Sequence, residues 1–341
     1  MTLLAVDRLS VSFPVRSAIL QRRIGELLAV RDVTLTVASG ETLAVVGESG
    51  SGKSTAARAI ARIAPARSGA IRFGGTDLLG LSGPALRNAR RALQMVFQDP
   101  YSALNRRWRV SAIVSEPLDA HRIGSAAQRQ ATVAGLLARV GLDPAMASRF
   151  PAALSGGQRQ RVAIARALAL KPRLVICDEA ISALDVSVQA QILNLLAELQ
   201  RDIGLAYLFI THDLGVVRRF AHRVAVMHAG QVVETAPTSA LFAKPLHPYS
   251  AALLSAVPRI SGSAPSRIRL PGQPPSPAER PPGCLFAARC AHAVAICRTS
   301  PPPTLALPQG SSVACHRVAN GVALWRGDAD HRPPEQRTES R

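Results

Sequence analysis

Short apolar runs alternate with amphipathic stretches along the first 258 residues. Four of the runs, at residues 43–46, 95–97, 174–177 and 207–210, are typical of fully buried strands in a mostly parallel sheet. Helical periodicity occupies residues 126–140, where Ser125 and Gln128 match a capping box and Gly141 can end the helix, and residues 186–202. This alternation predicts an open α/β domain, in which ligands bind at the carboxyl ends of the strands.

A glycine-rich loop, G-E-S-G-S-G-K-S-T, follows the first of these strands and matches the Walker A pattern. Glycines let successive backbone N–H groups face phosphate oxygens, and the start of the next helix adds a positive dipole. We expect Lys53 to reach the β- and γ-phosphates and the Ser54 hydroxyl to bind Mg²⁺. The predicted nucleotide contacts are Gly47, Ser49, Gly50, Ser51, Gly52, Lys53, Ser54 and Thr55.

Polar residues follow the other three strands. Asp178 and Glu179 come directly after residues 174–177, the Walker B arrangement, in which Asp178 holds Mg²⁺ and Glu179 acts as the general base. Gln98 follows residues 95–97 and could ligate Mg²⁺ and sense the γ-phosphate. His212, just beyond residues 207–210, could hold the γ-phosphate and orient water.

A second phosphate-binding helix terminus is predicted at L-S-G-G-Q, residues 154–158. Ser155 can cap a helix that runs to about residue 169, and two glycines let a phosphate approach its first turn. One phosphate loop already accommodates one triphosphate, so this second terminus needs its own explanation.

Together these motifs resemble the ATP-binding subunits of ABC transporters over about residues 1–258, since L-S-G-G-Q is that family's signature. The resemblance implies a P-loop NTPase fold with a mostly parallel core sheet, an antiparallel β subdomain and a helical subdomain at about residues 100–170. It also implies that two such domains face head to tail, each ATP lying between the Walker A loop of one and the signature of the other. The residues that would touch the partner's ATP are Ser155, Gly156, Gly157 and Gln158; Asp185 would couple the two sites, and Phe13 would stack on adenine.

Three further strings narrow the resemblance to the oligopeptide/dipeptide importers: residues 96–105, 182–191 and 247–258. The tail around residues 281–290, P-P-G-C-L-F-A-A-R-C, is similar to the same group. This implies ATP hydrolysis coupled to transport, with peptides as the expected cargo. The implied partners are a second ATPase subunit (a copy or a paralogue), two membrane-spanning permease subunits and an external substrate-binding protein. The implied location is the cytoplasmic face of the cell membrane, as a peripheral subunit.

Residues 259–341 have a different character, with 13 of the 25 prolines and four of the five cysteines. We therefore expect a small C-terminal extension after an ATPase domain of residues 1–258. Cys284, Cys290, Cys297 and Cys315 could hold an iron–sulfur cluster, which some tails in the resembling family carry. Zinc, or four unligated cysteines in a Pro-rich cap, are the alternatives.

The formal net charge is +19, from 41 basic and 22 acidic residues, which suggests a nucleic-acid or membrane-surface partner. The excess is spread, with 30 basic against 17 acidic residues up to residue 258 and 11 against 5 beyond it. A soluble ABC-type ATPase acting on nucleic acid stays an alternative. We see neither the long coiled-coil insertion nor the second cassette that would favour it, so no nucleic-acid partner is expected. No transmembrane helix or signal peptide is expected.

Overall fold

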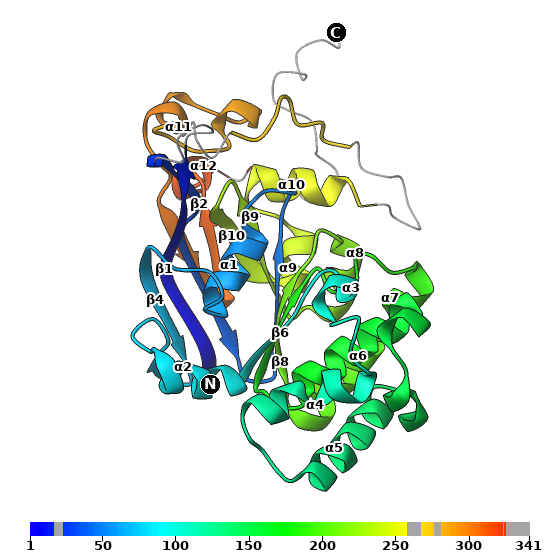
Figure 1. The fold of residues 1–341 in the computed structure, drawn as a ribbon. Coiled ribbons are helices and arrows are strands. Elements are labelled where there is room, and N and C mark those ends of the chain that lie inside the picture. Colours follow the sequence, from blue (N-terminus) through cyan, green and yellow to red (C-terminus); the bar gives the residue numbers. More distant parts are fainter. Residues whose placement is uncertain (17–22, 258–266, 276–280, 323, 325–341) are drawn as a thin grey trace.

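A mixed sheet of eight strands, in the order β11-β12-β10-β9-β3-β8-β7-β6, forms the centre of the computed structural model (Figure 1). The structure describes residues 1–16, 23–257, 267–275, 281–322 and 324. Five neighbouring strands are parallel: β3 (Thr42–Val46), β6 (Leu93–Val96), β7 (Leu174–Asp178), β8 (Ala206–Ile210) and β9 (Arg223–His228). Three antiparallel strands complete the sheet: β10 (Gln231–Pro237), β11 (Thr304–Leu307) and β12 (Ser311–Ala314).

The four strands predicted from the apolar runs are confirmed as β3, β6, β7 and β8. Every residue of β3, β7 and β8 is buried, because helices or the second sheet cover both faces of the parallel strands. The predicted α/β class with a mostly parallel core sheet is therefore confirmed.

A second, antiparallel sheet in the order β2-β1-β4-β5 packs against the first. Its strands are β1 (Thr2–Arg16), β2 (Arg23–Ala38), β4 (Ser68–Phe73) and β5 (Thr76–Asp77). One apolar core joins the two sheets, with Leu4 and Val33 from this sheet, Ile60 from helix α1 (Lys53–Ile60) and Ile210 from β8. Helix α1 is thereby fixed between the sheets, and its first residue is Lys53.

The remaining helices of the ATPase region lie around the central sheet, with α3 to α7 gathered on one side (Figure 1). They are α2 (Gly83–Arg91), α3 (Pro100–Ala103), α4 (Val110–Ala120), α5 (Ala126–Arg139), α6 (Gly156–Leu168), α7 (Val186–Ile203), α8 (Leu214–Phe220), α9 (Thr238–Ala243) and α10 (Pro248–Ser255). The capping box predicted at Ser125 is present, and Ser155 with Gln158 forms a second one at the start of α6. Val140, Leu154 and Leu137 belong to the apolar core that packs these helices on the sheet.

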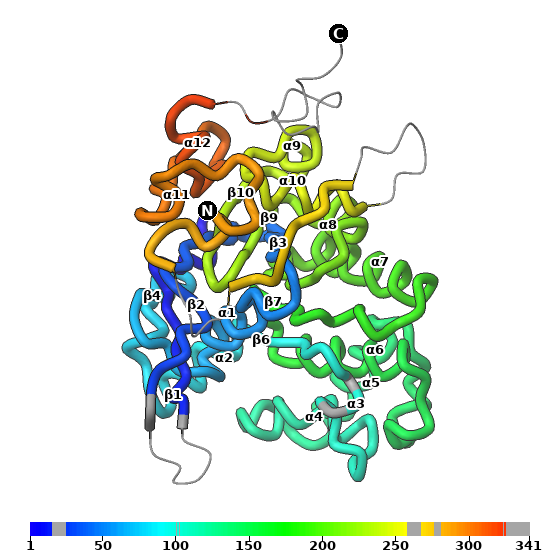
Figure 2. The backbone as a smooth tube through the Cα atoms, turned by 90° about the horizontal axis from the view of Figure 1, so that it is seen from above, coloured from blue at the N-terminus to red at the C-terminus, as the bar shows by residue number. Residues whose placement is uncertain are grey.

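The C-terminal extension continues the central sheet. Strand β12 pairs with β10, with Val313 opposite Glu234, and β11 adds a further edge strand. Two short helices, α11 (Ala295–Thr299) and α12 (His316–Ala319), flank these strands, and Figure 2 shows this orange-to-red part next to β10. The ring of Phe286 lies 5.5 Å from that of Tyr249 in α10, so the extension shares a core with the ATPase region. In the part of the chain that the structure describes, no helix is long and apolar enough to cross a membrane.

Candidate nucleotide-binding site

The loop between β3 and α1 has a backbone that glycine alone can adopt at two positions. Gly47 has φ +155° and a Cβ there would meet the Met227 carbonyl oxygen at 2.1 Å. Gly52 has φ +97° and its Cβ would meet the Ala29 carbonyl oxygen at 2.6 Å. The loop is therefore packed against β9 and β2, and its curvature depends on the absence of side chains.

Lys53 closes this loop on itself. Its Nζ donates hydrogen bonds to the carbonyl oxygens of Gly47 and Glu48, both at 2.9 Å, and only 5 % of the residue is exposed. Burial lowers the pKa of Lys53, while the nearby carboxylates of Glu179 and Asp178 act in the opposite direction. A buried ammonium group at the first residue of a helix, beside a glycine-rich loop, suits an anion such as a phosphate.

Asp178, the last residue of β7, is placed to hold a divalent cation. Its Oδ1 accepts a hydrogen bond from the Ser54 hydroxyl at 2.6 Å, so the predicted pair of Mg²⁺ ligands is in contact. Only 1 % of Asp178 is exposed, and Oδ2 accepts no hydrogen bond from any described residue; the nearest cation is Arg58 Nη2 at 3.8 Å. Burial raises the pKa of Asp178. A buried carboxylate with a free oxygen beside a hydroxyl fits Mg²⁺, which favours oxygen ligands.

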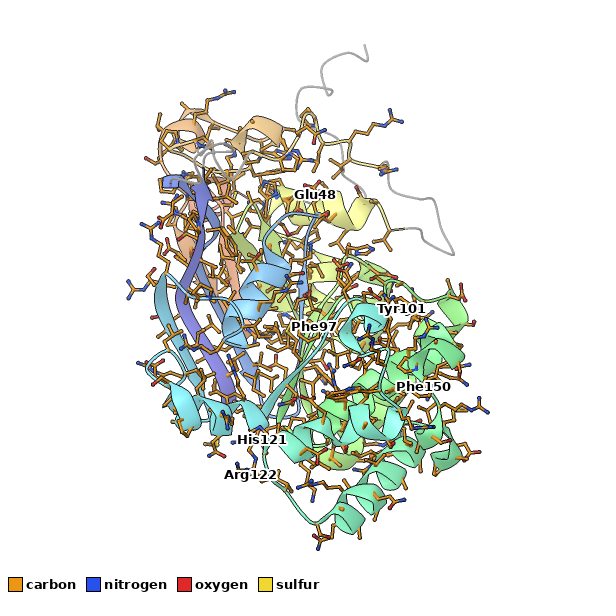
Figure 3. All side chains as sticks on the ribbon, viewed as in Figure 1. Glu48, Phe97, Tyr101, His121, Arg122 and Phe150 are labelled. Atoms are coloured by element: carbon orange, nitrogen blue, oxygen red, sulfur yellow. The ribbon has the colours of Figure 1, made fainter. Side chains whose placement is uncertain are left out.

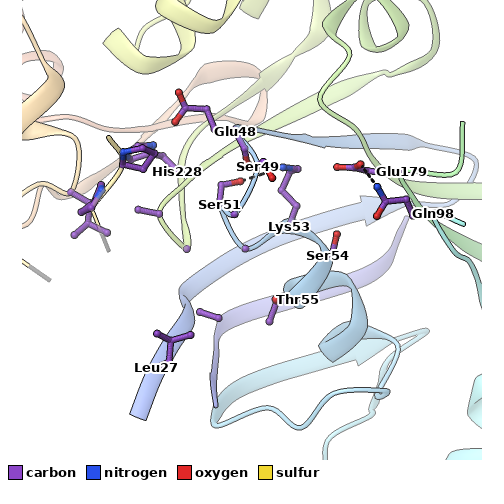
Figure 4. Close-up of a pocket in the computed structure, with 18 residues that line it drawn as sticks. Leu27, Glu48, Ser49, Ser51, Lys53, Ser54, Thr55, Gln98, Glu179 and His228 are labelled. Carbon is purple, nitrogen blue, oxygen red and sulfur yellow. Dashed lines mark hydrogen bonds between the residues drawn. The ribbon is translucent and has the colours of Figure 1, made fainter. Parts of the chain in front are cut away.

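Glu179, Gln98 and His212 meet beyond the ends of β7, β6 and β8. The Gln98 amide donates a hydrogen bond to Glu179 Oε2 at 2.8 Å (Figure 4), and His212 Nδ1 lies 3.6 Å from Glu179 Oε1. Glu179 has φ +47°, an unfavourable backbone for a residue with a side chain, and its N–H donates to the Ile210 carbonyl oxygen at 3.0 Å. Strain of this kind persists where the surrounding structure determines the conformation, which is common at functional sites.

The pocket beside the loop is lined by many residues that lie outside the Walker A motif. It is lined by Leu27, Ala29, Glu48, Ser49, Gly50, Ser51, Gly52, Lys53, Ser54, Thr55, Gln98, Glu179, His228, Ala229, Gly230, Pro274, Pro275 and Leu285 (Figure 4). The sequence argument does not single out the lining residues from β2, the β9–β10 turn or the extension, because they lie far from the motifs and match no pattern. The Gly230 turn, between two antiparallel strands, is the one local signal that could have drawn attention to this part of the wall.

Phe13, predicted to stack on adenine, is on β1 and is 39 % exposed, but it does not line this pocket. Its cross-strand partner on β2 is Leu27, which does. Residues 17–22, which connect β1 to β2, lie outside the described residues.

The second predicted phosphate site is at the first turn of α6 and is not part of the same pocket. Ser155 Oγ accepts from the Gln158 N–H at 3.3 Å, and Gln158 Oε1 accepts from the Ser155 N–H at 3.0 Å. Gly157 packs against α7, where a Cβ would meet Val188 Cγ1 at 2.6 Å. Asp185, at the start of α7, also lies outside the pocket lining. The two predicted phosphate-binding elements of one chain therefore lie apart.

The four cysteines of the extension give no support to the predicted iron–sulfur cluster or zinc site. All four are free thiols, and burial raises the pKa of Cys284, Cys315 and Cys290, the last to about 12. No three His, Cys, Asp or Glu side chains in the described ranges are grouped so that they could hold a metal ion. The four-thiolate site therefore stays a prediction that the described residues do not support. The fifth cysteine, Cys177, is buried in β7.

Comparisons with known proteins agree with this geometry. Residues 30–182 match the ABC transporter family, and residues 233–297 match the oligopeptide/dipeptide transporter C-terminal region. A probable peptide ABC transporter ATP-binding protein of Sinorhizobium fredii is 52 % identical over 323 residues, which cover 94 % of this chain and 91 % of that protein. The oligopeptide transport ATP-binding protein AppF of Bacillus subtilis is 47 % identical over 319 residues, 92 % of this chain and 97 % of its own.

Two further similarities are more limited in extent. The glutathione import ATP-binding protein GsiA of Pectobacterium atrosepticum is 49 % identical over 277 residues, 81 % of this chain but 44 % of that protein. Among solved structures, a dimeric ATP-binding cassette in a post-hydrolysis state, bound to ADP and Pi, is 28 % identical with a TM-score of 0.62. That likeness covers 69 % of this chain and 99 % of the cassette, so it stops short of the whole chain.

Proposed function

The chain belongs to the ABC transporter family as an ATP-hydrolysing subunit, and we propose that it powers the import of peptides. The support for peptides is the match of its C-terminal region to oligopeptide/dipeptide transporters and the names of relatives that it covers almost completely. The cargo itself would be selected by the membrane subunits and the external substrate-binding protein.

The observation that carries the mechanism is the separation of the two phosphate-binding elements. The start of α6 does not line the pocket of its own chain, although its capped first turn and two glycines suit a phosphate. We propose that two ATPase subunits, identical or paralogous, face each other head to tail. Ser155, Gly156 and Gly157, with Gln158, would then contact ATP bound by the partner, and Asp185 would lie between the two sites.

Within one subunit, we propose that Lys53 and the loop N–H groups bind the β- and γ-phosphates. Ser54, Asp178 and Gln98 would hold Mg²⁺, and Ser54 and Asp178 are already in contact. When bound, Mg²⁺ would neutralise phosphate charge and orient the γ-phosphate for attack. Phe13 remains our proposal for adenine stacking, since residues directly opposite on paired strands are close and Leu27 lines the pocket.

For hydrolysis, we propose Glu179 as the general base. Its carboxylate would take a proton from water as the water oxygen attacks the γ-phosphorus and the bond to ADP breaks. His212 would hold the γ-phosphate and orient the water. The Gln98 amide already donates to Glu179, so it is placed to align this base and to respond when nucleotide fills the pocket.

Transport requires that closure of the ATPase pair moves membrane subunits, and we propose two permease subunits that dock near Gln98. Two aromatic rings, Tyr101 and Phe150, are 37 % and 41 % exposed on this side of the molecule (Figure 3), which supports a protein contact there. An external substrate-binding protein would deliver the peptide, and the chain would sit at the cytoplasmic face of the membrane.

The test is to isolate the tagged chain from membranes and to reconstitute what co-purifies into vesicles. We expect multi-span permeases, a second ATPase, and ATP turnover that a peptide mixture with its binding protein stimulates; Lys53→Ala serves as the nucleotide-binding control. Co-purifying nucleic acid that salt removes, without permeases, would favour the alternative of a soluble ATPase acting on nucleic acid. Turnover that peptides leave unchanged in the complete assembly would refute the peptide cargo.

A further inference from the structure

A buried arginine of the C-terminal extension contacts the phosphate loop. Arg289 is 7 % exposed, and its Nη1 and Nη2 donate to the two carboxylate oxygens of Glu48 at 2.8 and 3.0 Å. Glu48 is the second residue of the Walker A loop, 241 positions earlier in the chain. A bidentate arginine–carboxylate pair is among the stronger and more directional polar contacts in proteins.

The same guanidinium group also holds another wall of the pocket. Arg289 Nε donates to the Pro271 carbonyl oxygen at 3.2 Å. Residues 271–275 form a strap that ends in Pro274 and Pro275, both of which line the nucleotide pocket. One side chain therefore connects the phosphate loop with a strap that borders the same cavity.

Glu48 carries the negative charge that Arg289 compensates. Its carboxylate is part of a loop that must accept the negative charge of a triphosphate, and its own N–H donates to the Tyr249 hydroxyl at 2.8 Å, which fixes it in place. The hydrogen bond from Arg289 is the main reason that the pKa of Glu48 is lowered, so the carboxylate stays ionised. Burial lowers the pKa of the neighbouring His228 to about 4, so this ring is uncharged at neutral pH and supplies no compensating cation.

We propose that Arg289 is a positioning residue for nucleotide binding, which compensates the charge of Glu48 and holds the phosphate loop and the strap together. The extension thereby contributes to the ATP site of its own subunit, in addition to its pairing with the sheet. The inference rests on the proposed role of this loop in binding ATP. It assigns Arg289 no contact with the nucleotide itself.

The test compares the ATP dependence of turnover in the full-length chain and its variants. Arg289→Gln removes the main group that compensates the Glu48 charge, so the KM for ATP should rise about tenfold, the equivalent of ~1.4 kcal/mol, with kcat within about twofold. Glu48→Gln removes the charge that Arg289 compensates and keeps a hydrogen-bond acceptor for Arg289, so the rise in KM caused by Arg289→Gln should be much smaller in a Glu48→Gln background. The double variant Arg289→Gln/Glu48→Gln should recover most of the lost affinity, a rescue that a purely structural role for Arg289 would not produce.

Two controls keep the outcome interpretable. Arg298→Gln removes an exposed arginine on α11 of the same extension and should leave KM unchanged. If Arg289→Gln does not fold, as judged by circular dichroism, Arg289→Lys keeps the charge with poorer geometry and should raise KM by a smaller factor. An Arg289→Gln KM equal to that of wild type, or a double variant no better than Arg289→Gln alone, would overturn the proposal. If the wild-type chain does not bind ATP, the proposed function itself is refuted.

Discussion

Asp178 and Glu179 are adjacent in the sequence, yet their surroundings assign them to different tasks. Asp178 is buried, and its Oδ1 accepts a hydrogen bond from the Ser54 hydroxyl. Burial raises the pKa of Asp178, and a bound divalent cation would act in the opposite direction by favouring the ionised carboxylate. Glu179 is the first residue after the strand and has a left-handed backbone conformation. Its carboxylate points to Gln98 and His212. The change of backbone between them separates the proposed metal ligand from the proposed base.

This separation predicts the behaviour of Glu179→Gln. The amide keeps the size and can still contact Gln98, but it cannot take a proton from water, so ATP turnover should fall by about 10²–10⁴-fold while ATP binding persists. Binding is measured by equilibrium titration and turnover by phosphate release, and the variant should accumulate as a closed, ATP-bound dimer on size exclusion. Turnover at the wild-type rate would remove Glu179 from the role of base.

At the residue scale, the predictable part of the site is the part encoded by local spacing. Lys53, Ser54 and Asp178 could be placed because each stands at a fixed offset from a buried strand, and the structure brings them together. The pair Arg289–Glu48 could not be predicted, because no local pattern relates two charges 241 residues apart. The same reason applies to the proline wall of the pocket.

Helices α5 and α6 begin with the same kind of capping box but lie at different places in the fold. Helices α5 and α6 both start with a serine and a glutamine in a complete capping box, at Ser125–Gln128 and Ser155–Gln158. The box at α5 has no connection to the nucleotide site. It therefore provides an internal control for the box at α6, whose first turn we propose to face ATP of the partner.

Ser125→Ala and Ser155→Ala should each reduce the free energy of unfolding by about 1 kcal/mol, since each leaves one N–H of the first turn without its acceptor. Only Ser155→Ala should also weaken ATP-dependent dimerisation and reduce turnover, by about tenfold. Chemical denaturation gives the stability of both variants, and analytical ultracentrifugation with ATP gives the dimer. Equal loss of dimer in both variants would show that helix stability alone is responsible.

At the scale of elements, strands with buried faces were predictable and long-range pairings were not. The runs that became β3, β7 and β8 are entirely apolar, because both faces of these strands are covered. Strands β1 and β2, of 15 and 16 residues, contain several register shifts, so their alternation of apolar and polar residues is interrupted. A pattern of period two is lost wherever a bulge occurs.

At the scale of the molecule, the boundary at residue 258 marks a change of composition and not an independent unit. Strand β12 covers the edge of β10, Phe286 is 2 % exposed among Tyr249, His228 and His247, and Arg289 reaches the phosphate loop. The sequence argument found the extension from its prolines and cysteines, and those residue types carry no information on which strand edge it would join.

A chain that ends at residue 258 should therefore be less stable and should bind ATP weakly. It loses the burial of Phe286 and Val313, worth several kcal/mol in total, so the thermal midpoint should fall by about 5–10 °C. The exposed edge of β10 should promote association, visible by size exclusion. Full-length Arg289→Gln separates the effects, because it should lose ATP affinity while keeping most of the stability. A truncated chain that stays monomeric, with unchanged midpoint and ATP affinity, would show that the extension is an independent appendage after all.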